Sequence, residues 1–138
     1  MNLSEKDVEE IASLLECGEH CFVHQNTGEI EHYPDPNDVY FDPEPWQEVM
    51  DKVEDDWDNY LAFEPMDSRQ GFKVMEDFAE SLSDRHFQEK LFRLLSEHKP
   101  FSKFKRAVDY SDYRTEWFEF KKQANIKWVK EELAYHLG

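Results

Sequence analysis

The sequence lacks the short motifs that usually mark a nucleotide-binding or hydrolytic enzyme. It has only four glycines, and none of them belongs to a glycine-rich loop of the kind that holds phosphate groups. No serine–histidine–aspartate or cysteine–histidine set can be proposed from the spacing of its residues. We therefore predict no catalytic residue, no cofactor and no metal ligand, and we favour a protein without enzymatic activity.

Cysteine and long apolar runs are scarce as well. Cys17 and Cys21 are too few for a disulfide scaffold, which favours a reduced, cytoplasmic protein. The first ten residues, MNLSEKDVEE, are acidic and lack the apolar run of a secretory signal peptide. No apolar run approaches the roughly 20 residues of a membrane-spanning helix, so we expect no membrane partner.

Basic residues are nearly absent from the first half of the chain. Residues 1–68 hold 20 Asp and Glu but only Lys6 and Lys52, a balance of −18, whereas residues 69–138 hold 12 acidic and 14 basic residues, a balance of +2. An acidic field of this size disfavours nucleic acids and attracts basic proteins or cations. The simpler alternative is an acidic surface that only keeps the protein soluble.

Aromatic residues, by contrast, are abundant and make up 15% of the 138 residues. Together with Leu, Ile and Val they can fill the core of one ordinary domain, so a charged fraction of 35% does not indicate disorder. We predict a single domain over residues 1–138, with an acidic helix-and-hairpin part at 1–66 and a helical part at 67–138.

A helix and a hairpin open the acidic part. Ser4 and Asp7 form a capping-box pattern ahead of apolar residues at helical spacing, which predicts a helix over residues 5–17. The turn sequence Asn26-Thr27-Gly28 then predicts a hairpin between strands at 20–25 and 29–33. We expect a bulge at the glycine, and this register would put Phe22, His24, Ile30 and His32 on one face.

A loop and a helix separate this hairpin from a third strand. Residues 34–45 hold four prolines and several aspartates, which predicts a loop. Val39, Tyr40 and Phe41 interrupt this polar run, so we expect them to be buried. An acidic helix with one apolar stripe follows from Pro45, and residues 60–63 predict a short strand.

The remaining residues show helical periodicity, with apolar side chains every three or four positions. We expect Ser83 to cap one of these helices, and Ser111 or Asp112 to cap the last. Trp117 and Ile126 would fall on opposite sides of a straight helix, so we predict a break near residues 123–125. The whole pattern predicts an α+β fold: a small antiparallel hairpin sheet near the N-terminus, packed against a mostly helical remainder of five or six helices.

The order of five short sequence pieces resembles one protein family. These pieces are NTGEI, GFKVMEDF, PFSKFK, EWFEF and IKWVKEEL. In their order and spacing the chain resembles uncharacterised protein family 0158, small bacterial cytosolic proteins, over residues 5–137. That family has no established activity, cofactor or catalytic residue, so the resemblance implies only a bacterial, single-domain, cytosolic protein. Glu116 stands where the family often has a basic residue, which weakens any basic role at this position.

Glu54, Asp55, Asp56 and Asp58 form the densest acidic run of the chain. Carboxylates bind hard cations, but this run lacks the glycine of an EF-hand loop. It also lies at the C-terminal end of a predicted helix, where the helix dipole disfavours negative charge. We interpret these residues as candidates for binding a basic partner; a solvated helix face is the ordinary alternative.

Lys103 and Arg106 lie among aromatic residues, a mixture that can bind nucleic acid by charge and stacking. Helical spacing favours a core helix with a basic outer side, because Phe104 and Val108 share a face from which both basic residues point away. We keep Lys103 and Arg106 as candidates for contact with an acidic partner, with the acidic half of this chain or with a second copy.

Two further groups carry metal-ligating or acid–base side chains. The first offers zinc ligands and consists of Cys17, His20, Cys21, His24 and His32. Strand alternation sends Cys21 and His24 to opposite faces, which favours structural roles for this group. The second group could supply acid–base chemistry and consists of His86, Glu116 and Glu119, a trio that nearly any acidic protein contains.

Three functions fit these observations. We favour a non-enzymatic protein-interaction or regulatory module that uses its acidic half to bind a basic protein. The alternatives are a small hydrolase or metal-dependent enzyme with a carboxylate–histidine site, and an acidic mimic of nucleic acid. A homo-oligomer is compatible with the first of these functions.

Overall fold

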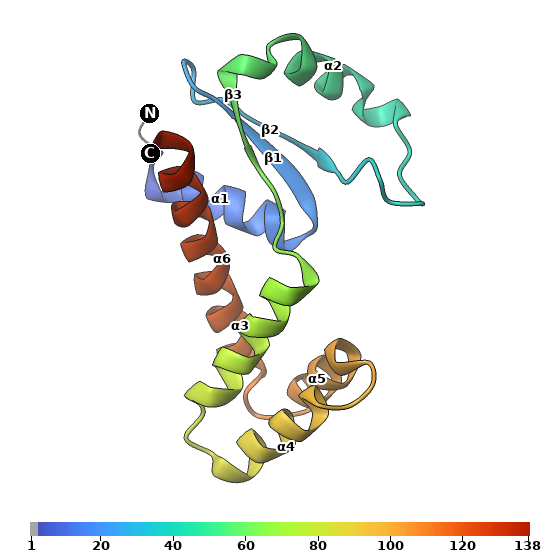
Figure 1. The fold of residues 1–138 in the computed structure, drawn as a ribbon, viewed down its shortest axis with the longest axis vertical. Coiled ribbons are helices and arrows are strands. Elements are labelled where there is room, and N and C mark those ends of the chain that lie inside the picture. The colour runs from blue at the N-terminus through green and yellow to red at the C-terminus, as the bar shows by residue number, and fades with distance from the viewer. Residues whose placement is uncertain (1–2) are drawn as a thin grey trace. The chain divides into compact units, whose positions relative to one another are not determined.

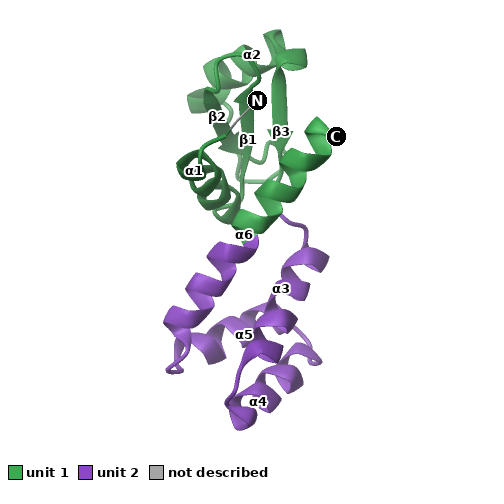
Figure 2. Ribbon diagram, turned by 90° about the vertical axis from the view of Figure 1, so that its left-hand side faces the viewer, with its two compact units in different colours: residues 1–65, 125–138 green, residues 66–124 purple. Residues whose placement is uncertain are grey.

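A computed structural model describes residues 3–138 and gives this part of the chain six α-helices and a three-stranded antiparallel sheet (Figure 1). The predicted α+β fold, with its sheet near the N-terminus, is confirmed. The chain divides into two compact units: unit 1 comprises residues 1–65 and 125–138, and unit 2 comprises residues 66–124 (Figure 2). No helix within residues 3–138 has both the length and the apolar character needed to cross a membrane.

Unit 1 is built around the sheet, whose strand order is β2-β1-β3. Its strands are β1 (Glu19–His24), β2 (Ile30–Pro34) and β3 (Tyr60–Phe63), so the third strand predicted at residues 60–63 is confirmed. Helix α1 (Glu5–Glu16) precedes the sheet. The Ser4 hydroxyl accepts a hydrogen bond from the Asp7 N–H, and the Asp7 carboxylate accepts one from the Ser4 N–H, which is the predicted capping box.

Helices cover both faces of this sheet (Figure 1). On one face α1 and residues 125–137 of α6 (Arg114–Leu137) bury a cluster that includes Ile11, Val23, Phe63 and Val129. On the other face α2 (Gln47–Asp55) packs Val53 against Phe22 and Tyr60. Two short 3-10 helices, η1 (Glu44–Trp46) and η2 (Trp57–Asn59), flank α2.

Side chains of α6 also protect the outer edge of β3. The Trp128 indole N–H donates to the Glu64 carbonyl at 2.9 Å, and His136 Nε2 lies 2.7 Å from the Ala62 carbonyl. An unpaired strand edge is a template for unwanted pairing, so occupied carbonyls at this edge disfavour aggregation.

The predicted hairpin register is wrong. Val23 pairs with Ile30 and Cys21 pairs with His32, so Ile30 shares a face with Val23 rather than with Phe22. The connecting loop is residues 25–29, two residues longer than the predicted loop. Gly28 does take the left-handed conformation expected of it, with φ of 75°.

The side chain of His24 accounts for the longer turn. Its Nδ1 atom accepts hydrogen bonds from the backbone N–H groups of Asn26 and Thr27, at 3.2 and 3.3 Å. The His24 carbonyl also accepts from the Gly28 N–H at 2.9 Å, which closes the turn. A histidine that satisfies two turn donors stabilises a loop that turn propensities alone do not predict.

The loop after β2 also differs from the prediction. Val39 and Tyr40, which we expected to be buried, are 89% and 92% exposed, whereas Phe41 is half-buried. Three aspartates shape this loop by accepting hydrogen bonds from the N–H two residues ahead: Asp35 from Asn37, Asp38 from Tyr40, and Asp42 from Glu44. These Asx turns hold the backbone without burying the apolar side chains.

Unit 2 consists of helices packed around one aromatic cluster. Its elements are α3 (Ser68–Ser81), α4 (Arg85–Leu95), α5 (Pro100–Asp109) and residues 114–124 of α6. Phe78, Phe104 and Trp117 meet at its centre, with ring centroids 5.0–6.3 Å apart. The cap of α4 is Asp84 rather than the predicted Ser83, because the Asp84 carboxylate accepts the Phe87 N–H.

The predicted break near residues 123–125 is wrong, because α6 is one continuous helix. The two apolar faces of α6 serve different cores. Trp117 belongs to the cluster of unit 2, whereas Ile126 and Val129 belong to a cluster of unit 1. A change of apolar face within one continuous helix therefore indicates a change of packing partner. The helix begins at Arg114, and Ser111 accepts the Tyr113 N–H just before it.

Candidate functional site

The four acidic candidates of unit 1 do not share one environment. Asp56 accepts hydrogen bonds from His24 Nε2 at 2.8 Å and from the Asn59 side chain at 2.6 Å. Because Nδ1 of His24 accepts two backbone bonds, the ring hydrogen lies on Nε2 and points at Asp56. The Asn59 amide and then His24 hold the pKa of Asp56 below its usual value. Asp56 thus ties α2 to the hairpin.

Glu54, Asp55 and Asp58 are exposed, with no ion pair to another residue in the described part of the chain. Unit 1 offers few cations to neutralise them, because it contains 21 acidic and four basic residues, a balance of −17. Lys52 contacts Glu31 at 2.7 Å and Glu29 at 3.4 Å. The acidic surface of unit 1 is therefore largely uncompensated.

The loop between β2 and η1 lies within this acidic surface. Residues 35–42, called the acidic loop below, carry three aspartates and present Val39 and Tyr40 to solvent. Two adjacent apolar side chains with about nine-tenths of their surface exposed stand out among residues of one charge sign. Sequence reasoning singled out this apolar segment but assigned it to the core, because exposure depends on the turn geometry.

The histidines of the zinc hypothesis each lie beside a different carboxylate. His32 Nδ1 is 2.6 Å from Glu19, His24 contacts Asp56, and His20 lies 3.9 Å from Asp35. Within residues 3–138 no three histidine, cysteine or acidic side chains gather as a metal site.

The two cysteines differ in environment. Cys21 is fully buried, and burial, followed by the charges of Glu19 and Glu10, raises the pKa of its thiol to about 12. Cys17 is exposed and free. A buried thiol with such a pKa stays protonated and unreactive at neutral pH, so Cys21 is a core residue.

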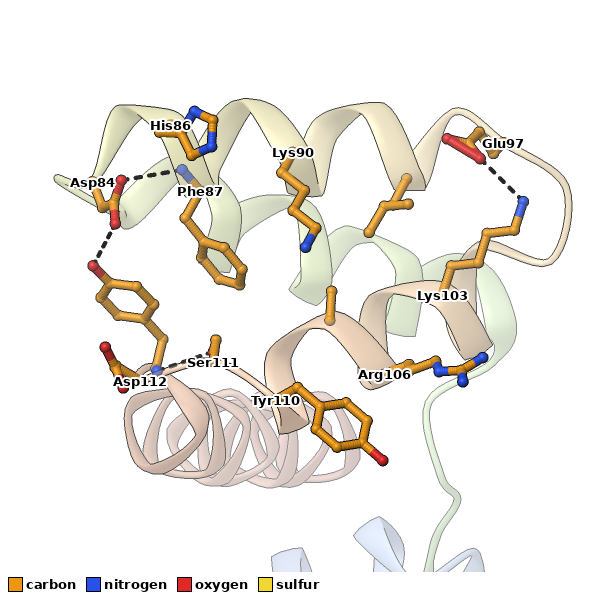
Figure 3. A pocket seen from close by; sticks show the side chains of 13 residues that line it. Asp84, His86, Phe87, Lys90, Glu97, Lys103, Arg106, Tyr110, Ser111 and Asp112 are labelled. Atoms are coloured by element: carbon orange, nitrogen blue, oxygen red, sulfur yellow. Dashed lines mark hydrogen bonds and ion pairs between the residues drawn. The ribbon is translucent and has the colours of Figure 1, made fainter.

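Unit 2 contains an open groove of about 680 Å³ between α4 and α5 (Figure 3). Phe87, Leu94 and Ala107 provide apolar lining. The predicted residues Lys103 and Arg106 line the same groove from α5, with Phe104 and Val108 buried on the other side of that helix. A groove of this size is within the range of ligand sites, about 300–1,000 Å³.

One end of the groove is fixed by a tyrosine–aspartate contact. The Tyr113 hydroxyl donates to Asp84 Oδ2 at 2.6 Å, and the Tyr113 ring stacks on Phe87 with centroids 5.1 Å apart. The Tyr113 hydroxyl, followed by the Phe87 N–H, lowers the pKa of Asp84, and the Asp84 carboxylate raises the pKa of Tyr113. Asp84 therefore has two roles: it caps α4, and it holds Tyr113, the residue just before α6.

Cations occupy the middle and the other end of the groove. Lys90 reaches from α4 toward α5, and Arg106 extends toward the end that holds Lys103 and Glu97 (Figure 3). Lys103 contacts Glu97 at 3.1 Å. Neither Lys90 nor Arg106 has an ion pair within residues 3–138. Sequence reasoning missed Lys90 because only the packing of α4 on α5 brings it near Arg106.

The acid–base trio is not assembled in this groove. His86 lines it, but Glu116 and Glu119 lie on the exposed side of the first turns of α6 and are not among its lining residues. Glu119 accepts a hydrogen bond from Gln123 at 3.0 Å, an ordinary i,i+4 contact on a helix surface.

Comparison with known proteins gives one result. The model of an uncharacterised protein family, UPF0158, matches residues 20–136, which is most of the chain. Searches of curated proteins and of solved structures found no significant match. The family match covers the sheet except for its first residue, Glu19, and all of α2 to α5, so it includes both the acidic loop and the groove. The chain therefore belongs to the uncharacterised protein family UPF0158.

Proposed function

We propose that the protein is a non-enzymatic interaction module whose acidic loop binds a basic protein surface. The observation that carries the proposal is the exposure of Val39 and Tyr40, at 89% and 92%, inside a loop held by three Asx turns. Tyrosine is favoured at interfaces because it buries much area at a small entropic cost. Backbone hydrogen bonds to the aspartates reduce the ordering that binding would require.

The negative charge of unit 1 favours a basic protein as the partner. A surface of −17 raises the local concentration of a basic protein and accelerates its association, by an effect that salt weakens. Single exposed ion pairs add little affinity, typically below about 1 kcal/mol. Glu54, Asp55 and Asp58 therefore contribute to the rate of encounter, while Val39 and Tyr40 supply the buried contacts.

A cytoplasmic location belongs to the same proposal. Cys17 is a free, exposed thiol and Cys21 is a free, buried one. Exposed thiols persist in a reducing compartment and oxidise outside it, which supports a cytoplasmic protein. A bacterial cell would supply abundant basic partners for such a module.

A defined probe tests the proposal. We would titrate the protein with a fluorescent peptide of alternating lysine and leucine and follow its anisotropy. Tyr40→Ala should weaken binding about tenfold, as expected for a central aromatic contact. Tyr135→Ala is the matched control, because Tyr135 is 81% exposed in the same unit but lies on α6, outside the loop.

The two outcomes are distinct. Retained binding by Tyr135→Ala together with weakened binding by Tyr40→Ala supports the acidic loop as the contact surface. Equal affinity of the wild type and of Tyr40→Ala would contradict it, since the peptide would then respond only to diffuse negative charge.

A further inference from the structure

The acidic loop and the groove of unit 2 have complementary chemistry. The loop offers aspartates beside exposed apolar side chains, and the groove offers lysine and arginine beside an apolar lining. We propose that the groove of one molecule receives the acidic loop of a second copy of this chain. This inference rests on the proposed function, because it names the basic surface that the loop binds.

The groove can accept both kinds of side chain. Phe87, Leu94 and Ala107 offer apolar contacts for Val39 or Tyr40. Lys90 and Arg106 lack ion pairs within residues 3–138, so they can contact incoming carboxylates without giving up existing partners. Lys90 projects from α4 into the space above α5, where an incoming chain would meet it (Figure 3).

The carboxylates of the groove leave room for an acidic segment. Asp84 is engaged by the Tyr113 hydroxyl and the Phe87 N–H, and Glu97 by Lys103. Asp84 and Asp112 lie together at one end of the groove, away from Arg106 and Lys103 (Figure 3). The aspartates of the loop are therefore expected at the cationic end.

The loop matches this arrangement along its sequence. Asp38 and Asp42 bracket Val39 and Tyr40, so an apolar pair is framed by two negative charges within five residues. Asp38 accepts only the backbone N–H of Tyr40, at 2.9 Å, and Asp42 only that of Glu44 at the start of η1, at 3.1 Å. A carboxylate has several acceptor sites, so these contacts leave capacity for Lys90 and Arg106.

Two copies of a chain with a net charge of −16 repel one another at long range. At physiological ionic strength the screening length is about 8 Å, so contact pairs persist while the long-range repulsion is damped. Because every molecule carries both a loop and a groove, one molecule can receive a loop in its groove and offer its own loop to another molecule.

A complementation experiment tests the proposal on the full chain. The loop variant, Val39→Ser with Tyr40→Ser, keeps an intact groove. The groove variant, Lys90→Glu with Arg106→Glu, keeps an intact loop. All four side chains are exposed, so neither variant removes a buried contact.

Sedimentation velocity over micromolar to millimolar concentrations provides the readout. We expect the wild type to sediment faster as its concentration rises, each variant alone to remain monomeric, and an equimolar mixture of the two to form a 1:1 pair. The control variant, Arg69→Glu with Lys122→Glu, changes two exposed charges of unit 2 outside the groove by the same amount. It should associate like the wild type.

A monomeric wild type at all concentrations, or a mixture that stays monomeric while the wild type associates, would overturn the proposal. In either case the anisotropy titration decides separately on the function. If Tyr40→Ala still weakens binding of the lysine–leucine peptide, the acidic loop binds basic surfaces and only the second copy is wrong as its partner. If it does not, both proposals fail.

Discussion

The two units of this chain differ in how they bury apolar side chains and in their net charge. Unit 1 covers both faces of a sheet with helices and has a balance of −17, whereas unit 2 closes helices around one aromatic cluster and has a balance of +1. The features available for binding differ accordingly. Unit 1 has an exposed loop with aspartates and apolar side chains, and unit 2 contains a partly apolar groove in which Lys90 and Arg106 lack ion pairs within residues 3–138.

The largest expected effect is the loss of stability when a buried ring is removed from the core of one unit or of the other. Phe63→Ala in unit 1 and Phe104→Ala in unit 2 each remove a fully buried ring, at a cost of about 3–5 kcal/mol of unfolding free energy. In a Cys17→Ser background, labelling of Cys21 by a thiol reagent reports the opening of unit 1. We expect Phe63→Ala to accelerate this labelling at least about 100-fold, given tenfold per 1.4 kcal/mol.

Phe104→Ala tests whether unit 2 can open while unit 1 stays folded. It should accelerate hydrogen exchange in α4 and α5 while changing Cys21 labelling little. Equal acceleration of Cys21 labelling by both variants would contradict two separately stable units. It would instead favour the single domain over residues 1–138, which remains a prediction.

The next effect concerns α6, which both units share. Ala124→Pro would remove a hydrogen bond inside the continuous helix and clash with the preceding turn, costing about 3 kcal/mol or more. Ala124→Gly is the control and should cost about 1 kcal/mol. Urea unfolding would measure both. If proline proves no more costly than glycine, the helix is broken at this point, as the sequence pattern predicted.

Glycines give a smaller contrast between the units. Gly28 in unit 1 has φ of 75° with open space around it, so Gly28→Ala should destabilise by about 1–2 kcal/mol through backbone strain alone. Gly71 in unit 2 lies inside α3, where an added methyl group would meet Phe101 at an ordinary 3.7 Å. Gly71→Ala should therefore stabilise by about 0.5–1 kcal/mol. Thermal melts showing the same sign for both would refute this backbone assignment.

The smallest expected effect is a change with pH in the stability that the Asp84–Tyr113 contact gives to unit 2. The pKa of Asp84 is lowered by Tyr113, so their contact stabilises the fold above the ordinary carboxyl pKa of about 4 and is lost as Asp84 is protonated at lower pH. The pKa of Tyr113 is raised, so the contact is also lost once the phenol ionises above about pH 10. Tyr113→Phe should therefore be less stable than the wild type at pH 7 and nearly equal to it at about pH 2, in urea unfolding. A stability difference that does not change with pH would show that the hydroxyl acts by packing alone.

Local sequence patterns predicted the secondary-structure elements of both units but not how those elements pack. The capping box at Ser4, the strand at residues 60–63 and the helical stripes depend on neighbours in the sequence, and all of them were predicted correctly. The predicted break in α6 was wrong because Trp117 and Val129, on different faces of this helix, pack into two separate cores.

The candidate sites show the same limit. Lys103 and Arg106 were found from their own helix, but Lys90 and the Tyr113–Asp84 contact required the packing of α4 against α5 and α6. Asp56 looked like its acidic neighbours until His24 and Asn59 gave it a structural partner. The exposure of Val39 and Tyr40 depends on turns in which aspartates accept backbone hydrogen bonds. The segment DVYFD, residues 38–42, contains this signal, because an aspartate stands at each end of its apolar residues and can form an Asx turn.

The division of binding features between the units can be tested directly by ¹⁵N NMR on dilution of the full chain. Lowering the concentration from millimolar to micromolar should shift the amide signals of residues 38–42 in unit 1 together with those around Lys90 and Arg106 in unit 2, along one common binding curve. Signals of α1 and of the middle of α6 should stay in place. Shifts in only one of the two segments, or no dependence on concentration, would contradict a loop of one unit meeting the groove of the other in a second copy.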